Sequence, residues 1–357
     1  MFRNPNMRLA RSGGRNFDSA ARGVAFDAAG ASGYAFLQSQ LELIDTDLVK
    51  PLQAVTHPRD ITVKVGGGFP EFISAWASNY ASSGTKWLGL QGTNNTDIAE
   101  VQADIQKAVW KVFNWAAGMT ITHLDLQRME FAKRTGQSPP FSLQELYEES
   151  CQIVWNKALD LVTYLGFMGL PGLCNNTAVP EVAAITGAAG HLAWSTKTPA
   201  EILNDVNYLL NTVMANSGYD AARGMPDTLL VPYTQYALLT LPMTIGSGAG
   251  IGSGFTSTLD YIEKQCIAAH HGRPFKINFL PNDWLSGQGT GSPAGTDRAV
   301  CYRNDKDNLY LSVPQPVTKG MTVPTTRAGG AYETIYIGCV SQVIFKRTTT
   351  MVYLDGI

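Results

Sequence analysis

The glycine-rich run from Gly246 to Gly254 is the stretch of this sequence that most resembles a ligand-binding loop. Glycine-rich loops hold nucleotide phosphates when they match G-x-G-x-x-G after a strand, or when they end in Gly-Lys-Ser/Thr. Here every second residue is glycine, no lysine follows, and the run from Gly287 to Gly291 repeats the same alternation. We therefore expect loops or hinges at both places, and no nucleotide site.

The histidines do not form a metal or nucleophile site. His270 and His271 are adjacent, so at a helix end they point in different directions, and no Cys, Asp or Glu stands at metal-ligand spacing. His123 could pair with Asp125, but the sequence has no G-x-S-x-G nucleophile signature. A structural role is the interpretation we adopt for His123.

Two carboxylate pairs, Glu148-Glu149 and Asp305/Asp307, are the remaining candidates for acid–base chemistry. Neither has the apolar surroundings that would separate the two pKa values of a catalytic pair. The chain therefore predicts no catalytic residue, no cofactor and no metal, and we do not expect an enzyme. An enzyme with a strand-rich lid is the competing class, and it would need a convergent pocket of titratable groups.

Composition favours a protein whose surface is covered by neighbours. The chain has 357 residues, enough for two core-bearing units. Its hydrophobic content of 45% is ordinary, but its charged content of 16% is well below the usual ~25%. Charge keeps free monomers soluble. The net charge of −2 argues against a dedicated nucleic-acid-binding protein.

The cysteines, the N-terminal residues and the lack of a long apolar run suggest synthesis in the cytoplasm and no contact with a membrane. Five scattered cysteines make neither a disulfide framework nor a zinc site, so we expect reduced, mostly buried thiols: Cys151, Cys174, Cys266, Cys301 and Cys339. No apolar run reaches the ~18 residues that span a bilayer. The arginine-rich start lacks the apolar core of a secretory signal, although its composition also resembles a transit peptide.

The first 33 residues are polar, glycine-dotted and basic, and we expect an arm with no core of its own. Arginines of this arm are candidate assembly-interface residues, because they suit acidic neighbouring subunits or the phosphates of DNA: Arg3, Arg8, Arg11 and Arg15. From residue 36 to 55, apolar residues at helical spacing predict a short amphipathic helix.

Residues 58–122 predict an extended β-hairpin. Ile61, Val63 and Val65 alternate with polar residues, and so do residues 101–105 and 113–121. We interpret residues 61–65 as the first strand arm and residues 101–121 as the second, joined by a loose tip. A two-stranded hairpin is marginal alone, so its apolar residues need another subunit. At the tip we expect an interface formed by Lys86, Trp87 and Leu88.

Two capping boxes mark the starts of helices. Ser142 and Glu145 open a helix predicted over 142–166, roughly 35 Å long. Its predicted buried stripe is Leu143, Leu146, Tyr147, Cys151, Val154, Ala158, Leu161, Val162 and Leu165. Thr198 and Glu201 open a second helix. The buried stripe predicted for it is Ile202, Val206, Leu209, Leu210 and Val213.

Shorter elements follow these helices. We predict a buried strand within 226–232, a brief helix over 233–241 and a third helix over 258–268. Further strands are predicted at 275–279, 299–302, 309–313, 332–345 and 349–354.

In this order the elements resemble the major capsid proteins of tailed bacteriophages, which share the Hong Kong 97-type fold. Each stretch alone is weakly specific, and the resemblance rests on their sequence order along nearly the whole chain. It is carried by residues 37–44, 60–65, 113–122, 172–176, 198–203 and 226–232 and by the strands of 336–353.

The resemblance implies an α+β fold divided into an N-terminal arm, an extended loop, a peripheral domain with a long spine helix, and an axial domain. The implied boundaries are 1–57, 58–122, 123–199 with the spine helix at 142–166, 200–311, and return strands at 312–357. It also implies self-assembly into the hexamers and pentamers of an icosahedral shell around double-stranded DNA in a virion.

Further expected partners are scaffolding, portal and decoration proteins, with only non-specific contact to packaged DNA. The same fold occurs in encapsulin nanocompartments, and a tail or neck protein of a phage is another structural class. Closed shells, tubes or rings, and small discrete particles would distinguish these alternatives by electron microscopy.

Overall fold

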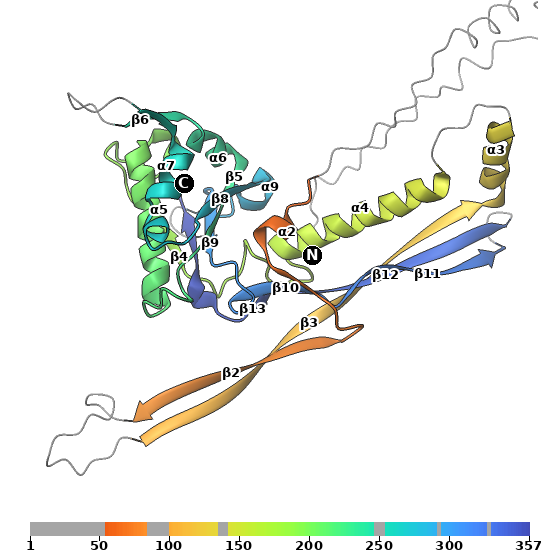
Figure 1. The fold of residues 1–357 in the computed structure, drawn as a ribbon, viewed down its shortest axis with the longest axis horizontal. Helices are drawn as coiled ribbons and strands as arrows, with labels where there is room; N and C mark the ends of the chain where they lie inside the picture. Colours follow the sequence, from red (N-terminus) through yellow and green to blue (C-terminus); the bar gives the residue numbers. More distant parts are fainter. Residues whose placement is uncertain (1–53, 84–99, 135–141, 246–253, 291–293, 327–329) are drawn as a thin grey trace, which may run out of the picture. The chain divides into compact units, whose positions relative to one another are not determined.

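A computed structural model describes residues 54–83, 100–134, 142–245, 254–290, 294–326 and 330–357 (Figure 1). Contacts divide the chain into Met1–Pro51 and Leu52–Ile357, and all described residues belong to the second unit. The predicted arm, the helix predicted at 36–55 and most of the Gly246–Gly254 run lie outside the described residues.

A five-stranded mixed sheet organises the core, in the strand order β4–β14–β9–β5–β8. Antiparallel pairing joins β14 to β9 and β9 to β5, whereas both outer pairs are parallel. The strands are β4 (Glu181–Ala183), β5 (Thr228–Pro232), β8 (Lys276–Leu280), β9 (Arg298–Tyr302) and β14 (Met351–Asp355). Every residue of β5, β9 and β14 is buried, so this sheet has a core on both faces.

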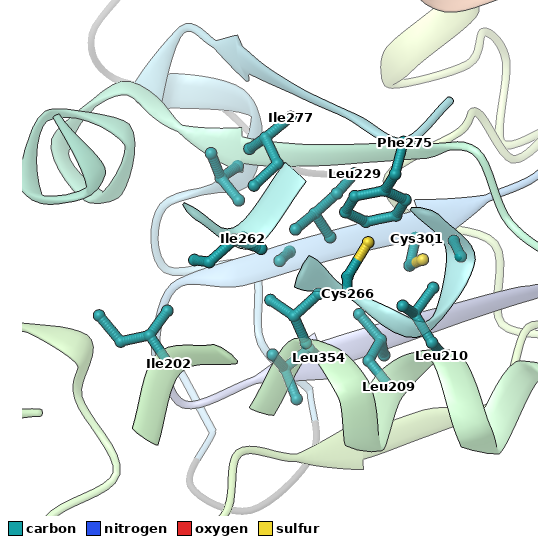
Figure 2. Packing of buried hydrophobic residues seen from close by; sticks show 14 of the residues in the cluster. Ile202, Leu209, Leu210, Leu229, Ile262, Cys266, Phe275, Ile277, Cys301 and Leu354 are labelled. Atoms are coloured by element: carbon teal, nitrogen blue, oxygen red, sulfur yellow. The ribbon is translucent and has the colours of Figure 1, made fainter. Parts of the chain in front are cut away.

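Side-chain alternation assigns successive residues of each strand to the two cores. Leu229 and Cys301 face the first core, which is covered by α5 (Pro199–Asn216), α7 (Thr258–Gln265) and α8 (Ile267–His270) (Figure 2). Their neighbours in sequence face the second core. That core contains the C-terminal half of α4 (Leu143–Tyr164) together with β1 (Val63–Val65) and β10 (Leu309–Val313).

A second sheet has the order β11–β12–β3–β2, with antiparallel pairing throughout. It consists of β2 (Phe72–Ser83), β3 (Glu100–Thr122), β11 (Gln315–Thr325) and β12 (Ala331–Ser341). The 23-residue strand β3 changes partner along its length. Residues 100–111 pair with β2 and residues 112–122 pair with β12.

Short elements complete the described structure. They are α2 (His57–Asp60), α3 (His123–Arg134), α6 (Tyr233–Leu239), α9 (Asn282–Leu285), β6 (Pro242–Ile245), β7 (Gly254–Ser257), β13 (Ile344–Phe345) and the 3₁₀ turns Trp194–Thr196 and Thr348–Thr350. The strands β6 and β7 pair with each other, and β10 joins β1 to β13.

Both capping boxes are confirmed. Ser142 and Glu145 cap α4, and Gly166 follows the helix in the left-handed conformation, with φ of 76°. Thr198 and Glu201 cap α5, whose predicted stripe is entirely buried. The helix α5 ends at the C-cap residue Ser217, and Gly218 follows it in the left-handed conformation, with φ of 69°.

The predicted first arm of the hairpin was wrong. Val63 pairs in parallel with Leu311 of β10, and Ile61 is buried in the second core. Three glycines with positive φ, Gly66 to Gly68, turn the chain away from β10 before the real arm, β2, begins at Phe72. Strand β11 and helix α3 were not predicted, and the predicted third helix is interrupted at Cys266.

The stripe predicted for α4 was partly wrong, because the helix has two apolar faces. Trp155, Leu159 and Val162 are the residues that pack in the second core. Val154 and Leu161 are 51% and 45% exposed. The spacing of apolar residues predicted the helix correctly. It did not determine which of the two apolar faces packs in the second core.

The cysteine prediction is confirmed. All five are free thiols, four of them buried and Cys151 partly buried. Burial raises the pKa of the Cys174 and Cys301 thiols well above the ordinary value. These two side chains are therefore uncharged apolar core residues.

Candidate assembly surfaces

One face of the hairpin formed by β2 and residues 100–111 of β3 presents large apolar side chains to solvent. The register pairs Phe72 with Lys111 and Trp76 with Lys107. Directly opposite residues of an antiparallel pair share a face. We call this surface the hairpin face, formed by Phe72, Trp76, Ile105, Lys107, Val109 and Lys111.

The apolar residues of the hairpin face are all half exposed or more: Phe72 50%, Trp76 69%, Ile105 67% and Val109 53%. Lys107 lies 5.7 Å from the ring centroid of Trp76, a cation–π contact that leaves most of the ring uncovered. Monomers rarely expose several large apolar residues together, and such patches mark interaction sites. The hairpin face has the character of an interface.

The root of the hairpin is anchored to the body by its other face. Trp110 packs with Tyr310 and Ile344, and Ile73 and Ala75 lie against the same cluster. Beyond this cluster a crevice of about 490 Å³ opens between the hairpin and the body, with Lys346 and Arg347 among its lining residues. The anchored root leaves the hairpin face uncovered.

A buried hydrogen-bond cluster connects α2 to α4. Asp160 accepts hydrogen bonds from the backbone N–H of His57 at 2.9 Å, from its Nδ1 at 2.6 Å and from the N–H of Thr56 at 3.3 Å. The carboxylate of Asp60 accepts a hydrogen bond from the Tyr164 hydroxyl at 2.6 Å. Burial, reinforced by Asp60, raises the pKa of Tyr164 well above its ordinary value. These contacts hold α2 to the C-terminal half of α4.

The three-stranded part of the second sheet has one covered and one open face. Trp115 and Met119 of β3 pack against α4 and its neighbours. The even-numbered side chains of β3 from 114 to 120 are exposed on the opposite face. A shallow groove of about 360 Å³ runs there, lined by Ala116–Thr120 and Glu333–Ile335.

A second open apolar surface follows α4. Tyr147, Val154 and Leu161, spaced by seven residues, are 38%, 51% and 45% exposed. Phe167 and Met168 extend it beyond the helix, and Met168 is 79% exposed with φ of 51°. The described subunit therefore exposes two apolar surfaces, this one and the hairpin face. Exposed apolar patches of this kind are unusual for a protein that stays monomeric.

Three of the polar residues weighed as catalytic candidates, His123, Asp125 and Glu148, have structural partners. Asp125 accepts a hydrogen bond from the Thr122 hydroxyl, and the His123 ring contacts Gln127 at 3.1 Å. Lys319 forms an ion pair with Glu148 at 2.6 Å. Within the described ranges, no three His, Cys, Asp or Glu side chains are grouped as metal ligands would be. None of the helices in these ranges combines the length and the hydropathy of a membrane-spanning segment.

The candidate interface residues named from sequence lie outside the described residues: Arg3, Arg8, Arg11, Arg15, Lys86, Trp87 and Leu88. Sequence reasoning missed the hairpin face. Its signal was present in residues 72–78, where Phe72, Ser74, Trp76 and Ser78 form one face of a period-2 pattern.

Comparison with known proteins agrees with a shell subunit. Residues 86–357 match the family model of the major capsid protein. The capsid of Myoviridae phage XM1 aligns with a TM-score of 0.61 at 15% identity, covering 89% of this chain and 98% of that chain. No curated protein sequence matches the chain.

Two further solved structures share the fold. A chain of Microbacterium phage Oxtober96 has a TM-score of 0.55 at 9% identity, covering 90% of this chain and 98% of its own. The capsid of a native GTA particle has a TM-score of 0.54 at 11% identity, covering 93% and 99% respectively. Identities this low establish a shared fold and nothing more specific.

Proposed function

Because the chain belongs to the major capsid protein family, we propose that it assembles into hexamers and pentamers that close an icosahedral shell around double-stranded DNA. As a member of this family it is a structural protein of the virion, and its role is multimeric assembly. We propose that it is made in the host cytoplasm before assembly.

The hairpin face is the observation that carries this proposal. Four large apolar side chains, each at least half exposed, lie on a two-stranded element whose described part packs against the body at its root. Burying them against a neighbour would gain about 25 cal/mol per Å² of apolar surface. A head-to-tail contact of this kind generates rings when the rotation between successive copies closes, and rings are the units of a closed shell.

The domain division implied by the resemblance remains part of the proposal. Residues 1–57 would form an arm and 58–122 an extended loop, with a peripheral domain at 123–199 and 312–357 and an axial domain at 200–311. We propose that Lys86, Trp87 and Leu88 contact the adjacent subunit from the loop tip, and that Arg3, Arg8, Arg11 and Arg15 contact acidic neighbours or packaged DNA.

Electron microscopy of the purified full-length chain tests the assembly proposal. Closed icosahedral shells are the expected result, and scaffolding, portal and decoration proteins are partners to add where the chain alone forms incomplete shells. Tubes, flat rings or small discrete particles under all of these conditions would overturn the proposal.

A deletion of residues 1–30 tests the arm separately. The polarity of the arm gives it no core to contribute, so the shortened chain should fold and melt as the full chain does while failing to form regular shells. Normal shells from the shortened chain would show that the arm is dispensable.

A further inference from the structure

Four exposed basic residues lie around β10, and we call them the basic cluster: Lys64, Lys306, Lys346 and Arg347. Lys64 belongs to β1, which pairs with β10, and Lys346 and Arg347 follow β13, its other neighbour. Among the described residues, none of the four forms an ion pair with a carboxylate. Positive charge that the fold does not neutralise attracts an anion.

Two cations of the basic cluster are held on one aromatic ring. The Nζ atoms of Lys64 and Lys346 lie 5.9 Å and 5.1 Å from the ring centroid of Tyr310. Tyr310 is itself buried and packs with Trp110 of the hairpin and with Ile344. A cation over an aromatic face is stabilised by the negative charge of that face. The ring therefore keeps two like charges close together at the root of the hairpin.

The backbone fixes the other side of the basic cluster. The N–H groups of Lys346 and Arg347 both donate to the carbonyl of the buried Asn308, at 2.8 Å and 3.2 Å. The Nζ of Lys346 also donates to the carbonyl of Lys306 at 3.0 Å. These cations are thus positioned by contacts within the subunit, before a partner binds.

Lys346 and Arg347 line the crevice of about 490 Å³ between the hairpin and the body. The hairpin side of this crevice is built from small side chains, with Ala75 of β2 directly opposite Ala108 of β3. Phe345 adds an aromatic ring on the body side. The volume lies within the ~300–1,000 Å³ range of ligand pockets, and the alanines leave that space open.

Two carboxylates reduce the positive charge here but do not cancel it. Asp307 lines the crevice. Asp104 lies farther along the same side of the hairpin as Ala108, where it accepts a hydrogen bond from Gln106 at 3.5 Å. Four cations against two carboxylates leave a surplus of two positive charges.

The shape and lining of the crevice favour an extended peptide over a DNA duplex. The crevice has apolar side chains on both walls and cations at one of them, whereas the chain as a whole has a net charge of −2 and no strongly basic character. Alternate side chains of an extended peptide point in opposite directions. Carboxylates on one side would then meet the cations, and apolar side chains on the other would meet the alanines.

We propose that the crevice binds an extended acidic peptide segment of a partner protein, with its carboxylates on Lys346 and Arg347 and its apolar side chains against Ala75 and Ala108. Charge-assisted hydrogen bonds from arginine or lysine to carboxylates are about twice as strong as neutral ones. The hairpin face lies on the other side of the hairpin, so a neighbouring copy bound there does not compete for the crevice. This inference goes beyond the proposed function, because it concerns a peptide partner and not the contacts between copies.

Fluorescence anisotropy of a labelled hexapeptide of alternating glutamate and valine tests the crevice on the unassembled full-length subunit. Binding should saturate at one peptide per subunit and weaken as salt is added. The same peptide with lysine in place of glutamate should not bind. Lys346→Glu combined with Arg347→Glu should weaken binding of the glutamate peptide at least tenfold.

The matched control for charge is Arg128→Glu combined with Arg134→Glu on α3, where the side chains are 71% and 76% exposed. It makes the same change in net charge away from the crevice and should leave the affinity for the peptide unchanged.

Ala108→Leu tests the space separately from the charge. The added side chain fills the crevice from an exposed position, so the subunit should keep its melting temperature while the affinity for the peptide falls at least tenfold. Ser74→Leu makes a similar addition on the opposite side of the hairpin, where Ser74 lies opposite Val109. This control should bind the peptide as the wild type does.

Three results would overturn the inference. They are the absence of saturable binding, an unchanged affinity in the variant with both Lys346→Glu and Arg347→Glu, and tighter binding of a short labelled DNA duplex with the same dependence on these two residues. The last result would assign the site to nucleic acid. Electron microscopy judges the proposed function independently, since the wild-type chain forms closed shells or fails to form them whatever the peptide does.

Discussion

Trp115 on β3 and Trp155 on α4 meet edge to face, with ring centroids 5.2 Å apart. This contact fixes α4 over the sheet, and Gly338 on the neighbouring strand makes room for it, since a Cβ there would lie 3.0 Å from the Trp155 ring. Edge-to-face aromatic pairs add ~0.5–1.5 kcal/mol beyond area burial. The pair joins two segments that only the folded chain brings together.

Gly338→Ala should destabilise the subunit by about 1–3 kcal/mol, because the added methyl group forces the Trp155 ring to move. The measurement is the urea midpoint of the unassembled subunit. Gly118→Ala is the matched control on the adjacent strand, where a Cβ meets open space, and it should lose no stability. Equal midpoints for both variants would contradict the packing argument.

The two apolar faces of α4 should respond differently to charge. Leu159→Asp places a carboxylate in the second core, where the native side chain is 5% exposed, and should prevent folding or cost several kcal/mol, within the ~2–7 kcal/mol range for unpaired buried polar groups. Val154→Asp, at a 51% exposed position, should express and melt close to wild type. Soluble expression with native melting for Leu159→Asp would be evidence against the assigned core face.

Asp160→Ala should destabilise the subunit by on the order of 3 kcal/mol, because it leaves buried donors of His57 and Thr56 without their acceptor. Thermal unfolding of the subunit measures this. Asp104→Ala, at an exposed position on the hairpin, serves as the control and should change little. If both variants have the same melting temperature, the cluster that joins α2 to α4 contributes nothing to stability.

Glu201 predicts a specific loss of stability in acid. The backbone N–H of Ala188, followed by the N–H and hydroxyl of Thr198, lowers the pKa of Glu201 to about 2. A depressed pKa in the folded state means that the stabilisation is complete above the unfolded value of ~4.3 and is lost as pH falls toward the folded value. Glu201→Gln should therefore flatten the decline in melting temperature between about pH 4.5 and pH 2.

The control for this experiment is Glu130→Gln on α3, where the carboxylate is 67% exposed and forms only a surface pair with Arg134. Its melting curve should keep the wild-type pH dependence. A Glu201→Gln profile parallel to that of the wild type would show that this carboxylate is not ionised preferentially in the folded state.

Interactions between neighbouring residues in the chain were readable from the sequence. The capping boxes of α4 and α5 join residues three apart, and the buried stripe of α5 follows one helical period. Prolines bounded the predicted strand that became β5. The presence of a hairpin could also be predicted, because alternation along residues 101–121 is a property of one strand.

Which apolar side chains stay exposed on the subunit could be determined only from the tertiary structure. Whether Val154 or Trp155 enters the second core is decided by the sheet beneath α4, and the hydrogen bond between the N–H of His57 and Asp160 spans 103 positions of the chain. The open face around Gly118 exists because α4 covers only the opposite face of β3. Capping and periodicity are set within a few residues, so the sequence by itself determined the helices and most strands. Long-range packing determines which face stays exposed, so only the tertiary structure decided which apolar surfaces remain open on the subunit.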